Sequence, residues 1–149
     1  KEEELQRALA SSLMISADNA HAVHPNVPEK SDPTNRVYLN QGIVIKYNAN
    51  QKYTTDGIAE ALFKKLLQKE EIPYQEYTNR SDIAGGSTLG NLSNEKISLN
   101  TVDMGAAQLA MHSAYETGGT KDTLSLVDGI RIFYESRIQM EEDGRYRCY

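Results

Sequence analysis

The middle of the chain most constrains the fold, because a strand, a helix and a second strand follow one another there. Residues Gly42–Tyr47 read GIVIKY and have the β-branched content of a strand. A helix follows, capped by Thr54 or Thr55 and ended by Pro73. YQEYT at Tyr74–Thr78 then alternates as a short strand. This order predicts an α/β fold with helices packed on a mixed sheet.

The remaining segments extend this alternation. The apolar positions of the central helix are Ile58, Leu62 and Leu66, with Ala59, Phe63 and Leu67 beside them. In chain order the sequence further predicts a helix at Glu2–Met14, a buried strand beginning at Leu13, loops at Pro25–Arg36 and Asn79–Leu92, a strand at Ile97–Val102, a loop at Asp103–Thr120 and a helix at Asp122–Met140. The inward positions expected on the last helix are Leu124, Val127, Ile130, Phe133 and Tyr134. We expect the polar tail EEDGRYRCY to be frayed.

Composition narrows the classes of function. A length of 149 residues suits one domain with a real core. The net charge is −5 without a basic cluster, so nucleic acid and anionic membranes are unfavoured partners. No apolar run is long enough to span a bilayer, and no signal peptide is visible. The one cysteine, Cys148, suits a reducing cytoplasm. Because the chain opens at Lys1 as if within a helix, we expect it to be part of a longer protein.

Two of the three histidines lie in SADNAHAVHPN at Ser16–Asn26. Asp18, His21 and His24 follow one another at intervals of three, which suits metal ligands or proton-transfer groups. The alternative is that both histidines are structural, bonding loop backbone or lying at an interface. The third histidine, His112, lies in a predicted loop and is either a site residue or a surface histidine. We expect the fold to bring Asp18 and His112 together.

Other residues suggest a pocket for a small anionic group. Lys46 ends the GIVIK strand and either snorkels to solvent or binds an anion. Tyr53 is a hydrogen-bond donor or a packing tyrosine. The run Gly85–Thr88 offers amides and hydroxyls to a carboxylate, or is simply a turn followed by a helix cap. No lysine follows it as in a P-loop, and no serine lies in a G-x-S-x-G elbow.

Four segments in order resemble the M18 family of zinc aminopeptidases, which includes aspartyl aminopeptidase. The segments are SADNAHAVHPN at Ser16–Asn26, GIVIKYNANQKY at Gly42–Tyr53, NRSDIAGGSTLG at Asn79–Gly90 and DMGAAQLAMHSAYET at Asp103–Thr117. The resemblance implies the C-terminal part of a three-layer α/β/α zinc-peptidase domain over residues 1–149. It also implies hydrolysis of N-terminal residues from peptides by a metal-activated water.

The resemblance assigns roles residue by residue. Asp18 would bind one of two zinc ions and His112 the other, although Co²⁺ or Mn²⁺ would also suit such a site. His21 would lie near the site, and His24 would be structural or form a subunit contact. Lys46 and Tyr53 would read the substrate side chain, which predicts a preference for Asp or Glu. Ser87, Thr88 and Met111 would line the pocket.

The sequence lacks the first histidine ligand, the bridging aspartate, the general-base glutamate and the glutamate ligand, which the family places before SADNAH. The separate dimerisation domain is also absent. We therefore expect a fragment that is inactive alone and that needs the missing N-terminal portion of the same enzyme. Family members are homo-oligomers, often dodecamers. The alternative is a non-catalytic module that retains the pocket and acts through peptide binding or assembly.

Overall fold

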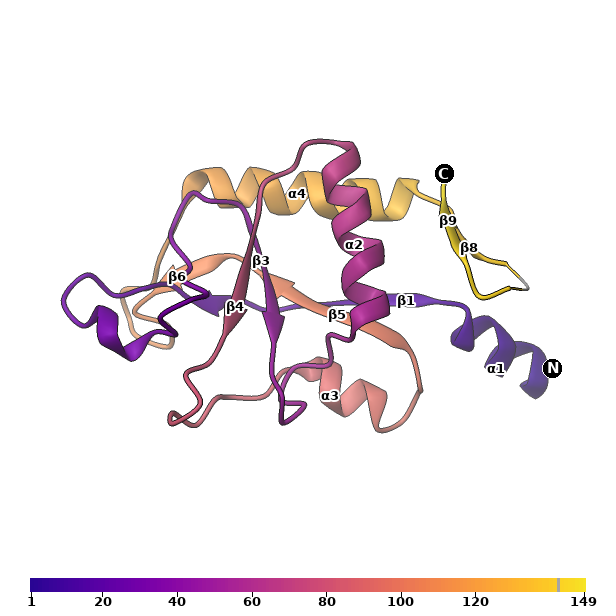
Figure 1. The fold of residues 1–149 in the computed structure, drawn as a ribbon, viewed down its shortest axis with the longest axis horizontal. Helices are drawn as coiled ribbons and strands as arrows, with labels where there is room; N and C mark the ends of the chain where they lie inside the picture. Colours follow the sequence, from indigo (N-terminus) through magenta and orange to yellow (C-terminus); the bar gives the residue numbers. More distant parts are fainter. Residues whose placement is uncertain (142) are drawn as a thin grey trace.

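The largest sheet is mixed and has four strands in the order β1-β5-β3-β4 (Figure 1). The structure is a computed structural model that describes residues 1–141 and 143–149. The four strands are β1 (Leu13–Ala17), β5 (Asn100–Gly105), β3 (Ile43–Tyr47) and β4 (Tyr74–Thr78). β1 is parallel to β5, β3 is parallel to β4, and β3 is antiparallel to β5. A mixed sheet with packed helices confirms the predicted α/β class.

The helices and the short strands surround this sheet. The helices are α1 (Glu2–Ala10), α2 (Gly57–Lys69), α3 (Leu89–Asn94) and α4 (Thr120–Glu135), with a 3-10 turn at Pro28–Lys30. A second sheet contains β2 (Ala20–His21), β6 (Ala107–Leu109) and β7 (Thr117–Gly118), and a hairpin contains β8 (Ile138–Met140) and β9 (Tyr146–Cys148). In the part of the chain that is described, every helix is too short or too polar to cross a membrane.

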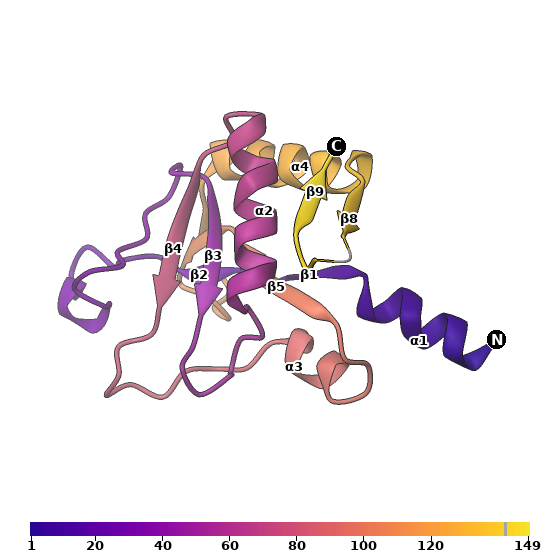
Figure 2. The ribbon, with the colours of Figure 1, turned by 45° about the vertical axis from the view of Figure 1, so that its right-hand side comes forward.

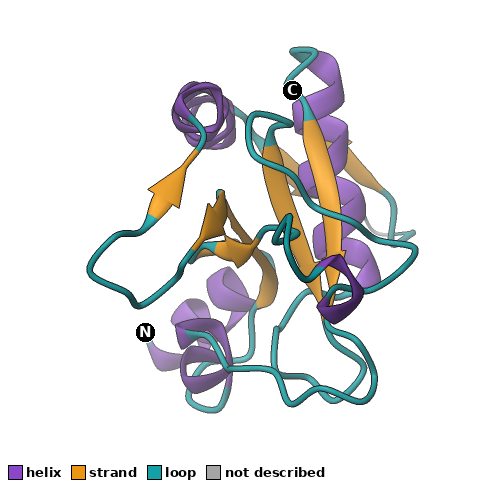
Figure 3. Cartoon of the chain, turned by 90° about the vertical axis from the view of Figure 1, so that its left-hand side faces the viewer, coloured by secondary structure: helices purple, strands orange, loops and turns teal. Residues whose placement is uncertain are grey.

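The main core lies between the sheet and the two long helices. Ile43 and Ile45 of β3 pack with Phe63 of α2 and Ile132 of α4. Figure 3 shows α2 running behind the paired strands β3 and β4. The stripe of Leu62, Leu66, Ala59, Phe63 and Leu67 is buried as predicted, whereas Ile58 is exposed.

The predicted start of the central helix is wrong by one or two residues. Asp56 caps α2, and its carboxylate accepts hydrogen bonds from the backbone N–H groups of Ile58 and Ala59. Thr54 and Thr55 instead bond to Asp103 of β5, at 2.8 and 2.9 Å. The two threonines therefore connect the segment before α2 to β5 of the sheet.

The face of the last helix is predicted correctly only in part, because Ile130 and Phe133 pack against the main core as expected and the other three positions do not. Leu124, Val127 and Tyr134 are exposed, whereas α4 buries Asp122, Ser125, Gly129 and Ile132. A Cβ at Gly129 would lie 2.4 Å from Ile43 Cδ1, so α4 comes too close to the sheet for large side chains. The Asp122 carboxylate accepts from the N–H groups of Asn40 and Gly42, at 2.7 and 2.8 Å. Close packing and a buried acceptor therefore outweigh hydrophobic periodicity.

Four further predictions need correction. The first helix ends at Ala10 and buries none of its residues (Figure 2). The strand predicted at Ile97–Val102 is shifted to β5, and the loop expected at Asp103–Thr120 contains β6 and β7. The tail is not frayed in its described residues, because β8 and β9 pair and Cys148 packs against the main core. Glu142, which the predicted tail includes, lies outside the described residues.

β5 and the segment after β1 approach each other closely at Gly105. A Cβ at this position would lie 1.9 Å from the carbonyl oxygen of Asp18 and 2.9 Å from the Cα of Asn19. Both contacts involve backbone atoms, which cannot move aside as a flexible side chain can. Only glycine therefore fits where the chain turns from β5 toward β6.

We predict that Gly105→Ala lowers the free energy of unfolding by about 3 kcal/mol, because the methyl group forces two paired strands apart. Urea unfolding of the protein measures this loss. Gly57→Ala is the matched control: a Cβ there meets nothing within 4 Å, and residue 57 begins α2. Its stability should be equal to the wild type or slightly higher. Equal losses in both variants would contradict the steric argument.

Candidate functional site

Two consecutive parallel pairings align the segment around Asp18 with the segment that leads to His112. β1 pairs with β5, and β2 then pairs with β6, with His21 opposite Gln108. Between them, the N–H groups of Asp18 and Ala20 donate to the carbonyls of Met104 and Ala106, at 2.8 and 2.9 Å. The residues beyond these pairings therefore leave the sheets side by side.

A cavity of about 440 Å³ lies where these segments end. Seven of the nine residues predicted for the site line this cavity: Asp18, His21, His24, Tyr53, Ser87, Met111 and His112. The structure thus brings Asp18 and His112 to one cavity, as the sequence predicts. Their roles as ligands stay predictions.

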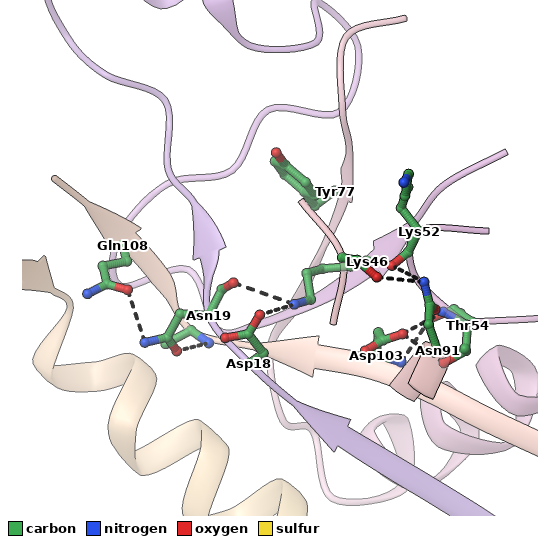
Figure 4. Close-up of polar contacts among 12 residues, drawn as sticks. Asp18, Asn19, Lys46, Lys52, Thr54, Tyr77, Asn91, Asp103 and Gln108 are labelled. Atoms are coloured by element: carbon green, nitrogen blue, oxygen red, sulfur yellow. Dashed lines mark hydrogen bonds and ion pairs between the residues drawn. The ribbon is translucent and has the colours of Figure 1, made fainter. Parts of the chain in front are cut away.

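Lys46 lies behind the cavity wall instead of on its surface. Its side chain is 1% exposed, and its Nζ is 3.4 Å from Asp18 Oδ2 and 3.5 Å from the Asn19 carbonyl oxygen (Figure 4). The Nζ also lies 5.0 Å from the centre of the Tyr53 ring. Both polar contacts are long for hydrogen bonds, so an ammonium with three donors retains binding capacity.

Burial controls the ionisation of the groups around Lys46. Burial lowers the pKa of Lys46, and the nearby carboxylates of Asp18 and Asp103 oppose that change. Burial also lowers the pKa of His21, and the charges of His112 and Lys46 act in the same direction. The pKa of Tyr53 is raised, mainly by burial. The Lys46 ammonium is therefore held in a partly dry environment, where electrostatic attraction is strong.

Thr88 is the second predicted residue that does not line this cavity. It is 6% exposed and lines an adjoining cavity that shares Asp18 and Ser87 with the first. Its Oγ1 is buried without a hydrogen-bond partner among the described residues. The Ser87 hydroxyl accepts a hydrogen bond from Asn91 Nδ2 at 2.8 Å. The glycine-rich loop thus contributes Ser87 to both cavities and Thr88 to the second cavity alone.

His24 makes a hydrogen bond with the backbone of its own loop. Its Nδ1 accepts a hydrogen bond from the backbone N–H of Asn26 at 3.2 Å, which fits the structural alternative considered for this residue. It also lines the edge of the cavity. Its suggested contact with another subunit stays a prediction.

The sequence analysis missed Tyr77, which lines the cavity from β4. Its ring centroid is 6.3 Å from that of Tyr53, its hydroxyl donates to Asn79 Oδ1 at 2.5 Å, and burial raises its pKa to about 12. The register places Tyr77 directly opposite Lys46. Its alternation with the exposed Glu76 in the predicted strand was the available signal, but the partner strand was unknown.

Asp103 and Asn19 were also missed. Asp103 is fully buried on β5, and its Oδ2 accepts from the Thr54 hydroxyl at 2.8 Å. The Asn19 side chain bonds Gln108 Oε1 and the Ala106 N–H, both at 3.1 Å (Figure 4). These contacts fix the segments on either side of Asp18. A carboxylate inside an apolar run was a signal for Asp103, but residues 103–120 were predicted to be a loop.

The chemistry of the donors at the cavity fits zinc in part. Carboxylate oxygen and imidazole nitrogen are ordinary zinc ligands, and Asp18 and His112 present one of each at the same cavity. Within residues 1–141 and 143–149, no group of three His, Cys, Asp or Glu side chains is close enough to hold a metal ion. A metal ion at this cavity would therefore need ligands from outside these residues, and the roles of Asp18 and His112 as ligands stay predictions.

Comparisons with known proteins identify the family of this chain. The family model described as "Aminopeptidase I zinc metalloprotease (M18)" matches residues 1–134. A probable M18 family aminopeptidase 2 from Clostridium novyi (strain NT) is 47% identical over 133 residues, which are 89% of this chain and 30% of that protein. The chain thus spans about a third of the length of such relatives.

Solved structures show the same fold. Ape4, in its complex with Nbr1, superposes with a TM-score of 0.88 at 36% identity, over 91% of this chain and 26% of that one. The S. cerevisiae mApe1 dodecamer superposes with a TM-score of 0.78 at 28% identity, over 88% of this chain and 28% of that one. With the family model matching most of its length, this chain belongs to the M18 family of aminopeptidase I zinc metalloproteases.

Proposed function

We propose that residues 1–149 form the C-terminal part of the catalytic domain of a zinc aminopeptidase. The observation that carries the proposal is that Asp18 and His112, far apart in sequence, line one cavity beside the buried Lys46. In the complete enzyme Asp18 would bind one of two zinc ions and His112 the other. The remaining ligands and the general-base glutamate would come from the preceding part of the protein.

The substrate would be a peptide with a free, acidic N-terminal residue. Zinc bound at the cavity would lower the pKa of a water molecule and polarise the scissile carbonyl. The chain's own residues would bind and orient the substrate. The Lys46 ammonium would attract an Asp or Glu side chain, while Tyr53 and Tyr77 would form the wall beside it. A neutral side chain would gain little from that ammonium, which gives the preference its physical basis.

Assembly and location follow as parts of the same proposal. The mApe1 relative is a dodecamer, and we propose a homo-oligomer here as well. Peptides would be its substrates, and Co²⁺ or Mn²⁺ would be acceptable replacements for zinc at nitrogen and oxygen ligands. The cytoplasmic location expected from the single cysteine stays a prediction.

The test compares zinc content and hydrolysis of a glutamyl chromogenic amide in the full-length protein and in Asp18→Ala. We expect the variant to lose zinc and to hydrolyse the substrate at background rate, because a carboxylate ligand is missing. Its melting temperature should fall, because the buried Lys46 ammonium loses the carboxylate beside it, so folding of the variant is checked by circular dichroism at the assay temperature. Asp128→Ala, which removes a surface carboxylate on α4, is the control and should keep both zinc and activity.

Activity that survives Asp18→Ala would show that the ligand assignment is wrong. The 149-residue chain alone tests whether the remaining ligands lie in the preceding part of the protein. We expect it to hold little zinc and to show no turnover. Tightly bound zinc with turnover would mean that this chain completes its own site.

Lys46→Met tests the basis of specificity, because it removes the charge and keeps most of the buried volume. We expect kcat/KM for a glutamyl amide to fall about tenfold, because the substrate carboxylate loses its attraction to the ammonium behind the cavity wall. The value for an alanyl amide should change little. An equal loss on both substrates would contradict the specificity role and would indicate that Lys46 only supports Asp18.

A further inference from the structure

The loop that carries His112 has an unusual backbone. It joins β6 to β7, which pair antiparallel with Leu109 opposite Thr117. Within it, Ala110 has a φ of 53° and His112 a φ of 68°. Both angles lie in the left-handed region that residues with a Cβ seldom adopt. Such conformations persist only where the surrounding contacts hold them in place.

A carboxylate supplies the main contact of this kind. Glu116 Oε1 accepts a hydrogen bond from the backbone N–H of His112 at 2.6 Å. Hydrogen bonds to ionised carboxylates are short and strong. The backbone of Glu116 immediately precedes β7, which is paired with β6. The bond therefore connects the strained residue to an anchored strand end.

Two weaker contacts complete the loop. The Ser113 N–H donates to the Ala110 carbonyl at 3.0 Å, and the Tyr115 N–H donates to the Ser113 hydroxyl at 3.0 Å. Neither contact involves the amide of His112. None of the ion pairs found among the described residues includes Glu116, so no cation in that part of the chain competes for its carboxylate.

We propose that Glu116 is a positioning residue for His112. The backbone angles of a residue fix the direction of its Cα–Cβ bond, so a change of φ at His112 would turn the imidazole away from the cavity. By holding the His112 amide, Glu116 keeps the imidazole on the cavity wall that also contains Asp18. The inference rests on the proposed function, in which His112 binds zinc.

The test uses four variants of the full-length protein, measured against the wild type. The first two are Glu116→Ala, which removes the acceptor, and Glu116→Gln, which keeps an acceptor oxygen. The third adds Ala110→Gly to Glu116→Ala, because glycine adopts the left-handed conformation without a Cβ penalty. The fourth, Glu135→Ala, removes an exposed carboxylate at the end of α4 and is the control.

Three quantities are measured for each variant: the Kd for zinc by chelator competition, the amide exchange of residues 110–116 in the zinc-free protein, and the melting temperature. We expect Glu116→Ala to weaken zinc binding about tenfold, as loss of a residue supporting a ligand commonly does, and to speed exchange of the His112 amide. Glu116→Gln should retain most of the affinity, and Ala110→Gly should restore part of the loss. The control should match the wild type, and all melting temperatures should be similar.

The outcomes separate this inference from the proposed function. If the wild-type protein binds zinc and Glu116→Ala binds it equally well, the inference is wrong and the proposed function stands. The inference also fails if Glu116→Gln is as weak as Glu116→Ala, because charge and not the hydrogen bond would then matter. A wild-type protein without zinc would reject the proposed function and, with it, the role given to His112.

Discussion

The close contact between Gly105 and the Asp18 carbonyl is the constraint on which the site depends. It lets β1 pair with β5 and lets the same two segments continue as β2 and β6. Because both pairings are parallel, the two segments travel in the same direction and end at the same cavity. Backbone pairing thus brings the two candidate ligands, Asp18 and His112, to the same cavity. Their side chains then supply the carboxylate and the imidazole.

Around that contact the sheet buries charges that a core normally excludes. Lys46 on β3 and Asp103 on β5 are both almost completely buried, and Asp103 Oδ1 lacks a hydrogen-bond partner in the described part of the chain. Such groups cost stability unless they are paired. Here Asp103 also ties Thr54 and Thr55 to the sheet, next to Tyr53 on the cavity wall. The buried charges therefore connect the stability of the fold to the shape of the cavity.

The parts of the fold that could be predicted are those where one local signal dominates. GIVIKY forms β3 because β-branched residues favour a buried strand, and α2 forms where apolar residues recur at helical spacing. Leu124, Val127 and Tyr134 were placed on the wrong face of α4, because the face nearest Ile43 is occupied by the small residue Gly129. Tyr77 and Asn19 were missed because their partners, Lys46 and Gln108, lie on other strands.

By itself, the sequence determined the alternation of strands and helices, the family, and the residue types able to bind a metal or an acidic group. These properties depend on local propensity and on motifs that are continuous in the chain. Only the tertiary structure decided that Asp18 and His112 share a cavity, that Thr88 lies on its neighbour and that Lys46 lies behind Asp18. Those facts depend on pairing between strands that are distant in the sequence. The free energy of pairing depends on both strands together, so neither segment alone reveals its partner.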